Sequence, residues 1–179
     1  MENPPQNLQS IIDGCLKNDR KAQRALYEMF AGKMLVVCMR YCGDKQTAQD
    51  WMHDGFISIY SNIKQYQNKG AFEGWMRKIM VNVSLDHLRR NRLVFDDNEE
   101  AMFAVYDDSQ PNQIEQLSAK EILQMITRLP ANQRTVFNLH AIEGYSLVEI
   151  AHKLNINEAT VRSHYARARQ TLRTMIEKG

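Results

Sequence analysis

Cysteine, proline and glycine are scarce in this chain, and long apolar runs are missing. Its 179 residues include 3 Cys, 4 Pro and 8 Gly. A small, odd cysteine count argues against a disulfide framework and is typical of a reducing compartment. So few turn-forming residues argue against a turn-rich all-β or fibrous fold. No uncharged apolar run approaches the ~18–20 residues that a membrane-spanning helix needs, and the N-terminal segment is polar rather than signal-like. We therefore expect a cytoplasmic protein.

Two of the cysteines, Cys38 and Cys42, lie four residues apart and would share one face of a helix. Such a pair can supply half of a metal site, but a structural site needs about four ligands. No second Cys/His pair at ligand spacing lies nearby in the sequence. We therefore interpret both cysteines as small buried apolar residues, and we expect no metal and no other cofactor.

The formal net charge is only +2, but the charges are unevenly distributed. Residues 1–93 carry 14 Lys or Arg against 9 Asp or Glu, and residues 119–179 carry 9 against 5. The intervening residues 94–118 carry seven acidic side chains and no basic one. This distribution indicates two basic modules joined by an acidic segment.

Apolar residues recur at helical spacing in both basic blocks, and no segment has the alternation of a strand. The clearest stripe consists of Met52, Phe56, Ile59, Tyr60 and Ile63. Between residues 94 and 118 the periodicity fails, acids dominate and Pro111 interrupts the chain. We predict an all-α protein with two helical domains, 1–93 and 119–179, joined by the acidic linker 94–118.

Capping residues mark several expected helix ends in the second block. Ser118 with Glu121, and Ser146 with Glu149, have the spacing of a capping box, in which each side chain satisfies a backbone amide of the other residue. Gly144 is expected to adopt the left-handed conformation that ends a helix. Two short helices and their boundaries follow from these residues.

A short capped helix, a tight turn at residues 155–157 and a longer basic helix follow one another, which is the pattern of a helix-turn-helix. Val161 and Ala168 are expected to pack against the other helices. Tyr165 faces the same way and is expected either to pack there or to contact a phosphate, and Asn157 is expected to cap the last helix. The intervening positions are then available to meet DNA: Thr160, Arg162, Ser163, His164, Ala166, Arg167 and Arg169. Arg can pair bidentately with guanine, Ser can bond a base or a phosphate, and Ala leaves room for a thymine methyl. The alternative is a helix whose arginines only face solvent; the turn, the caps and the net charge of this block favour DNA.

Asp50, His53 and Asp54 would lie on one face of a helix in the first block. An Asp/His/Asp cluster is compatible with a metal site or with acid–base chemistry. One helical turn supplies only three ligands, however, and no partner motif follows. A polar patch that docks on a protein partner explains the cluster better.

Aromatic, basic and amide side chains are interleaved from Lys69 to Asn82, and the basic pair Arg89 and Arg90 follows. Single-stranded nucleic acid is bound by this combination, with cations for the backbone and flat or polar pockets for splayed bases. The alternative makes Phe72 and Trp75 ordinary core residues. The interleaved charges favour a nucleic-acid interface for the segment as a whole.

Taken together, these residues resemble a bacterial σ factor of the σ70 superfamily, in its extracytoplasmic-function (ECF) group. The resemblance covers nearly the whole chain outside the linker. In the first block it rests on Ala48 to Phe56, Phe72 to Asn82 and Asp86 to Arg90. In the second block it rests on Leu129-Pro130, Arg134, Val136-Phe137, Glu143 to Ser146, Glu149 to Ala151, Thr160 to Ser163, Ala166 to Arg169 and Leu172-Arg173. Both halves in this order form a specific signature.

The resemblance implies a dissociable subunit of RNA polymerase that confers promoter recognition and catalyses nothing itself. Domain 1–93 would be σ region 2, which clamps onto coiled-coil helices of the largest polymerase subunit and captures melted bases of the −10 element. Domain 119–179 would be σ region 4, which binds the polymerase flap and reads −35 duplex DNA through its helix-turn-helix. Members of the group are commonly held inactive by an anti-σ factor, often membrane-bound. The implied partners are therefore core RNA polymerase, promoter DNA and an anti-σ factor.

The resemblance also implies site residues, position by position. The core-polymerase-binding set is Asp50, His53, Asp54 and Phe56. The −10 DNA-binding set is Lys69, Phe72, Trp75, Arg77, Asn82, Arg89 and Arg90. The −35 DNA-binding set is Thr160, Arg162, Ser163, Ala166, Arg167 and Arg169. Family members usually have Glu at position 49 and Gln at position 53, so Gln49 and His53 are departures from the pattern.

Two other classes of protein compete with this interpretation. A helix-turn-helix regulator that does not replace a polymerase subunit would explain the second block, but the first block resembles no sensor domain. An enzyme or metalloprotein built on Asp50, His53 and Asp54 would leave the helix-turn-helix unexplained. We therefore expect a σ factor, with the regulator as the alternative.

Overall fold

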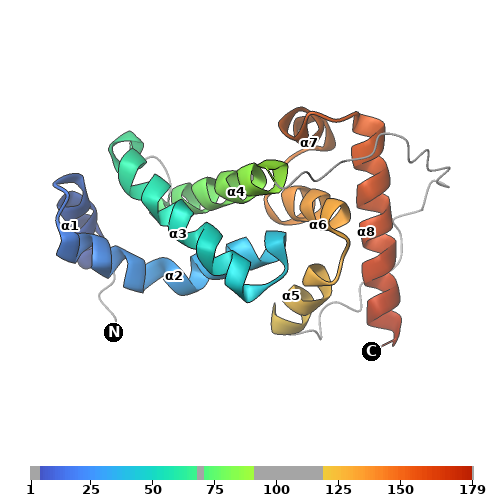
Figure 1. Ribbon diagram of the computed structural model, residues 1–179, viewed down its shortest axis with the longest axis horizontal. Coiled ribbons are helices and arrows are strands. Elements are labelled where there is room, and N and C mark those ends of the chain that lie inside the picture. The colour runs from blue at the N-terminus through green and yellow to red at the C-terminus, as the bar shows by residue number, and fades with distance from the viewer. Residues whose placement is uncertain (1–4, 68–70, 91–118, 179) are drawn as a thin grey trace. The chain divides into compact units, whose positions relative to one another are not determined.

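The computed structural model describes residues 5–67, 71–90 and 119–178, and every regular element in these ranges is a helix (Figure 1). The chain divides into two compact units at residues 91 and 92. The first unit contains α1 (Pro5–Leu16), α2 (Arg20–Cys42), α3 (Lys45–Asn62), a short 3₁₀ helix (Ile63–Gln65) and α4 (Phe72–Arg90). The second contains α5 (Ala119–Thr127), α6 (Ala131–Phe137), a π-helical turn (Asn138–Ile142), α7 (Leu147–Leu154) and α8 (Glu158–Lys178). The all-α prediction is confirmed. The predicted acidic linker 94–118, Ser118 of the first expected capping box and Lys69 lie outside the described residues.

In the first unit, the long helix α2 packs against α1, α3 and α4. Helix α2 ends at Gly43, whose φ of 88° is the left-handed conformation that glycine adopts without a Cβ clash. Asp44 then caps α3, because its carboxylate accepts a hydrogen bond from the Thr47 amide at 2.9 Å. These two residues reverse the chain and place α3 beside α2.

The core of the first unit is built from long apolar side chains on the facing sides of α2, α3 and α4. The fully buried members include Leu26, Met34, Tyr41, Ile59, Met76 and Met80. Gly55 lets α3 and α4 approach closely, because a Cβ at this position would overlap Met80 Sδ. Because these sides of α2, α3 and α4 pack into the core, the opposite side of each helix, called its outer face below, faces solvent.

The prediction that Cys38 and Cys42 are both buried is confirmed for Cys38 and is wrong for Cys42. Cys38 is fully buried, and burial raises the pKa of its thiol to about 12. Cys42 is partly exposed instead, and its Sγ donates to the Asp44 carbonyl at 3.1 Å. Both are free thiols.

In the second unit, α8 packs against α5, α6 and α7 over a small core that includes Val136, Leu139, Ile150 and Val161. Arg134 is almost fully buried, and its guanidinium donates to the carbonyls of Thr127 at 2.9 Å and Leu129 at 3.2 Å. These bonds satisfy carbonyls at the end of α5, which would otherwise lack partners. Across the described ranges, no helix is both long and apolar enough to cross a membrane.

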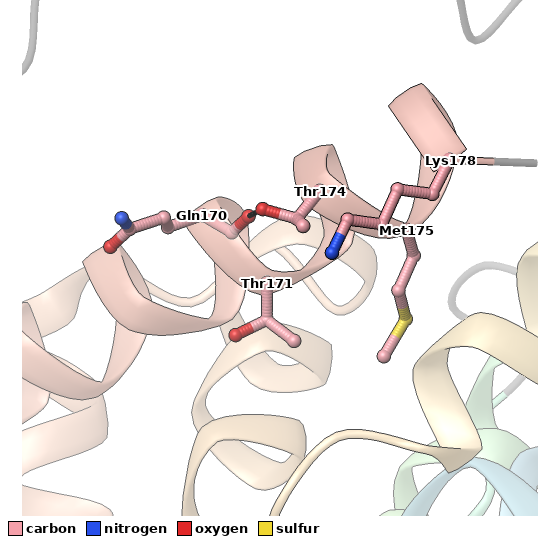
Figure 2. A pocket seen from close by; sticks show the side chains of 5 residues that line it. All are labelled: Gln170, Thr171, Thr174, Met175 and Lys178. Atoms are coloured by element: carbon pink, nitrogen blue, oxygen red, sulfur yellow. Dashed lines mark hydrogen bonds between the residues drawn. The ribbon is translucent and has the colours of Figure 1, made fainter.

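An open hollow of about 440 Å³ runs along the C-terminal half of α8 (Figure 2). Its lining residues all come from this one helix: Gln170, Thr171, Thr174, Met175 and Lys178. The hollow contains none of the predicted site residues.

Candidate nucleic-acid interface

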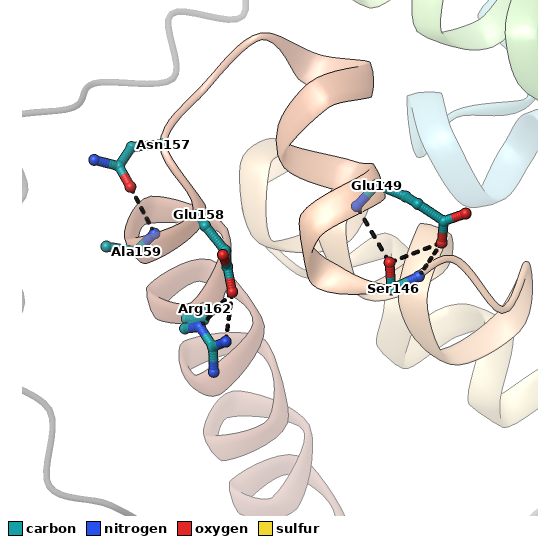
Figure 3. Close-up of polar contacts among 6 residues, drawn as sticks. All are labelled: Ser146, Glu149, Asn157, Glu158, Ala159 and Arg162. Carbon is teal, nitrogen blue, oxygen red and sulfur yellow. Dashed lines mark hydrogen bonds and ion pairs between the residues drawn. The ribbon is translucent and has the colours of Figure 1, made fainter.

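Helices α7 and α8 are joined by a tight turn, and the caps predicted for the starts of these two helices, at Ser146 and Asn157, are present (Figure 3). Ser146 caps α7 by accepting from the Glu149 amide at 3.2 Å, and the Glu149 carboxylate accepts from the Ser146 amide at 2.7 Å. Asn155 ends α7 in the left-handed conformation, with φ of 55°. The Asn157 side chain then accepts from the Ala159 amide at 2.9 Å at the start of α8. The Asn157 bond fixes the first turn of α8, and in helix-turn-helix proteins this end of the second helix is the part that contacts base edges.

The predicted DNA-facing residues of α8 divide by exposure. Arg162, Ala166 and Arg169 are exposed, while Thr160, Ser163 and Arg167 are half-buried. Val161 and Ala168 are fully buried, as predicted, and anchor the opposite side of the helix. Helix α8 therefore presents a face in which two arginines flank a small alanine, with three polar residues along its edge.

His164 is an exception to the sequence prediction. It was expected to meet DNA, but it is only 4% exposed. It lies three residues after Val161 and four before Ala168, both of which pack into the core, so the same side of the helix carries all three. His164 is thus a core residue of this unit.

The arginines of this face are already held by neighbouring side chains. Arg162 Nε donates to Glu158 Oε1 at 2.9 Å, one turn earlier on α8 (Figure 3). The Arg169 guanidinium lies over the Tyr165 ring, 5.9 Å from its centroid, and the His140 ring meets Tyr165 edge-on at 4.6 Å. Because these contacts already restrict the arginine rotamers in the free protein, less side-chain entropy is lost when the arginines bind a ligand.

In the first unit, the outer face of α4 collects part of the predicted −10 set. Trp75, Asn82 and Arg89 recur at heptad-like spacing and are half-buried or exposed. Lys78 lies between Trp75 and Asn82 on this face and is exposed, although it is not among the −10 residues that the family resemblance implies. Lys78 follows Trp75 by three residues and precedes Asn82 by four, and this spacing is the feature of the sequence that could identify it as part of the face. Arg77 lies on a different side of the helix, so it does not belong to this face.

Aromatic rings gather at the start of α4. Phe72 is only 4% exposed, and its ring lies 5.4 Å from Trp75 and 4.9 Å from Tyr66. Phe72 is therefore a buried support for the other two rings, and its predicted contact with −10 DNA stays a prediction. Trp75 and Tyr66, whose rings are 5.6 Å apart, are half-buried and keep an exposed edge.

The outer face of α3 carries the predicted docking residues Asp50, His53 and Asp54, all exposed. His53 Nε2 lies 3.2 Å from the Tyr27 hydroxyl, and the two rings stack with centroids 6.0 Å apart. Asp54 Oδ2 lies 2.8 Å from His87 Nε2. These contacts tie the polar side chains of α3 to α2 and α4.

Phe56, the fourth predicted docking residue, lies one turn after His53 on the buried side of α3. It is 2% exposed and packs against Tyr27 with ring centroids 4.7 Å apart. Phe56 thus supports the α3 helix from within the core, and its predicted role in docking stays a prediction. Within residues 5–67, 71–90 and 119–178, no group of three His, Cys, Asp or Glu side chains is arranged to hold a metal ion.

Comparison with known proteins identifies relatives of both units. The family model "Sigma-70 region 2" matches residues 26–94, and "Sigma-70, region 4" matches residues 119–172. The ECF RNA polymerase sigma factor SigE of Mycolicibacterium smegmatis is 32% identical over 160 residues, which cover 86% of this chain and 61% of that protein. The chain thus spans less than two thirds of this relative. SigW of Bacillus subtilis is 29% identical over 171 residues, which cover 89% of this chain and 91% of that protein.

Solved structures with the same fold are also found. The sigma factor RpoE from Bartonella quintana, solved with the anti-sigma factor NepR, has a TM-score of 0.50 at 17% identity and covers 86% of this chain and 96% of its own. CnrH, solved with the cytosolic domain of CnrY, has a TM-score of 0.50 at 16% identity and covers 97% of this chain and 99% of its own. At these identities the matches indicate a shared fold.

Proposed function

The chain belongs to the σ70 family of RNA polymerase sigma factors, in its ECF group, and from this membership we propose that it directs promoter-specific transcription initiation. In this proposal, residues 1–93 dock on core polymerase and capture the melted −10 strand, and residues 119–179 read −35 duplex DNA. Residues 94–118 connect the two. The observation that carries the proposal is the presence of both σ modules, in order, in one chain.

We assign −35 recognition to the exposed face of α8. Arg162, Ala166 and Arg169 are exposed on a helix whose first turns are fixed by caps, which suits insertion into a major groove. Arg162 is placed to pair with guanine and Ala166 to contact a thymine methyl, while Thr160, Ser163 and Arg167 line the edge of the contact. Arg169, held over Tyr165, suits a phosphate contact.

We assign −10 capture to the outer face of α4. Asn82 offers hydrogen bonds to a base edge, Trp75 offers a partly exposed ring, and Lys78 and Arg89 offer charge to the backbone. Lys69 and Arg90 remain in the proposed −10 set. Arg77 also remains in it, although its position on a different side of α4 places it beside this face. Unpairing costs a few kcal/mol per extruded base, and contacts made only to the open strand offset that cost. Such a protein shifts a binding equilibrium and breaks no covalent bond, so we propose that it is not an enzyme.

We assign docking on core polymerase to the outer face of α3, through Asp50, His53 and Asp54. An acidic face cannot serve DNA binding, because it repels phosphates, so it suits a protein partner. By family analogy the partner surface is the clamp helices of the largest subunit, and region 4 binds the flap. RpoE was solved with the anti-sigma factor NepR, and CnrH was solved with the cytosolic domain of CnrY. We propose that this chain too is restrained by an anti-σ factor and acts on polymerase in the cytoplasm.

Run-off transcription tests the proposal as a whole. Core RNA polymerase is incubated with fragmented genomic DNA, with and without the protein, and transcript starts are mapped. New transcripts that share a two-part motif upstream of their starts are expected. Unchanged transcription together with tight duplex binding would instead indicate a regulator that does not replace a polymerase subunit. An Arg24→Ala variant is the matched control, because Arg24 is exposed, pairs only along α2 with Glu28 and lies outside every proposed face.

A further inference from the structure

The outer face of α3 contains a large apolar side chain among its polar ones. Ile57 is 63% exposed, whereas the other exposed large hydrophobic residues among those described are between 37% and 48% exposed. It follows His53 by four residues and Asp54 by three, so it lies on the same face as both. Core packing does not account for it, because Met52, Phe56 and Ile59 already fill the buried side of α3.

We propose that Ile57 is the apolar anchor of the surface by which α3 docks on core RNA polymerase, and that its occupant is a polymerase surface with basic side chains around an apolar pocket. This inference rests on the proposed function. A central apolar residue surrounded by polar and charged groups is the usual anatomy of a protein interface, in which the apolar centre contributes affinity and the charged rim contributes steering. Asp50 and Asp54 supply such a rim here.

Charge decides against two other occupants of this face. DNA is excluded because the carboxylates of Asp50 and Asp54 would meet phosphates. A second copy of the chain is disfavoured because a two-fold dimer would bring the same acidic patch against itself. A basic protein surface is the occupant that these charges fit.

The neighbours of Ile57 are ordered before any partner arrives. The His53 ring is held by the Tyr27 hydroxyl, and Asp54 is held by His87. The His87 ring in turn stacks on Trp51, with centroids 5.1 Å apart and planes 8° from parallel. A surface whose side chains are already restrained loses little conformational entropy on binding.

The test measures association and dissociation rates of the labelled full chain with core polymerase at several salt concentrations. Ile57→Ser should bind roughly 10- to 100-fold more weakly, the range expected when one large apolar side chain is lost from an interface, and mainly through faster dissociation. Asp50→Asn should instead slow association and weaken its salt dependence. Ile57→Leu, which keeps the apolar surface, should bind like the wild type.

Val36→Ser is the matched control, because Val36 is another β-branched residue, 44% exposed, in the C-terminal third of α2. It should leave the binding of core polymerase unchanged. Circular dichroism checks that each variant is folded, and Ile57→Gln, a better helix former, replaces Ile57→Ser if the latter melts at a lower temperature.

Wild-type affinity of both polar variants at position 57 would overturn the inference while leaving the proposed function intact. An equal loss in Val36→Ser would also overturn it, because the effect would then not belong to this face. A wild-type dimer that dissociates in Ile57→Ser with unchanged core affinity would assign the face to self-association. Failure of the wild type itself to bind core polymerase would refute the proposed function and the inference together.

Discussion

Replacing Arg162 with alanine tests the proposed DNA-reading face of α8 directly, because this arginine is exposed near the capped start of the helix. A bidentate contact between Arg and guanine is worth about 1–3 kcal/mol. In the free protein Arg162 is paired with Glu158, and an exposed pair of this spacing contributes up to about 0.5 kcal/mol. If DNA binding breaks that pair, the net loss in Arg162→Ala is about 0.5–2.5 kcal/mol, or roughly 2- to 70-fold in affinity.

The assay is fluorescence anisotropy with a duplex that contains the −35 element found by run-off transcription. Each variant is titrated on this duplex and on one with the element scrambled. Arg162→Ala should lose affinity for the promoter duplex and lose preference over the scrambled one. Glu158→Gln should have the opposite effect on affinity, because it releases Arg162 and removes a negative charge beside the DNA.

Arg173→Ala is the control for the loss of a paired arginine. Arg173 Nε donates to Glu177 Oε1 at 2.9 Å, the same contact distance as in the Arg162 pair. It lies eleven residues further along α8, about 16 Å from Arg162 at 1.5 Å per residue. Undiminished promoter preference in Arg162→Ala, or an equal loss in Arg173→Ala, would refute a base contact by Arg162.

Three further predictions concern the α4 face and the fold. Lys78→Ala should reduce the salt-dependence slope for single-stranded −10 DNA by about 0.7, while Arg77→Ala should change it less, as salt titrations would measure. Asn82→Ala should reduce permanganate reactivity of melted thymines while co-purification with core polymerase is retained; equal loss of both would make Asn82 structural. Ser146→Ala should lower the free energy of unfolding by about 1 kcal/mol in thermal denaturation. The difference in unfolding free energy between Ser146→Ala and the wild type should shrink at acid pH, because hydrogen bonds from Ser146 lower the pKa of Glu149. The stability that these bonds provide is fully present above the ordinary pKa of glutamate. It is lost as the pH falls through the lowered pKa of Glu149 in the folded protein.

Much of the fold could be predicted from residues that act locally. The break between α2 and α3 follows from Gly43 and Asp44, and the box at Ser146 and Glu149 starts α7, because both depend on backbone bonds within four residues. The π-helical turn after α6 was not predicted. It depends on how residues 138–142 pack within the second unit, and no nearby capping residue signals it.

Side-chain exposure was predicted less well, for a reason that His164 illustrates. A helix has 3.6 residues per turn, so a residue at the border of the apolar stripe can face the core or the solvent. His164 lies at such a border beside Val161, and the tertiary contacts turn it inward. A polar side chain at a border position therefore needs the structure before it can be assigned to an interface.

Ile57 and Lys78 show the reverse error: the sequence motifs assign them no interface, yet both side chains are exposed. Motif comparison selects residues whose type matches a pattern, so an apolar residue on an acidic face is assigned by default to the core. Its 63% exposure contradicts that default. Lys78 fits any solvent-facing helix, and only its position between Trp75 and Asn82 on the outer face of α4 distinguishes it. The two faces that we propose for the first unit differ in charge. Asp50 and Asp54 on α3 suit a protein partner, whereas Lys78 on α4 suits the melted strand, with Arg89 paired to Asp86 at 3.0 Å beside it. A σ factor holds polymerase and DNA at once, so in this proposal the carboxylates on α3 would repel the DNA that the α4 face is proposed to bind.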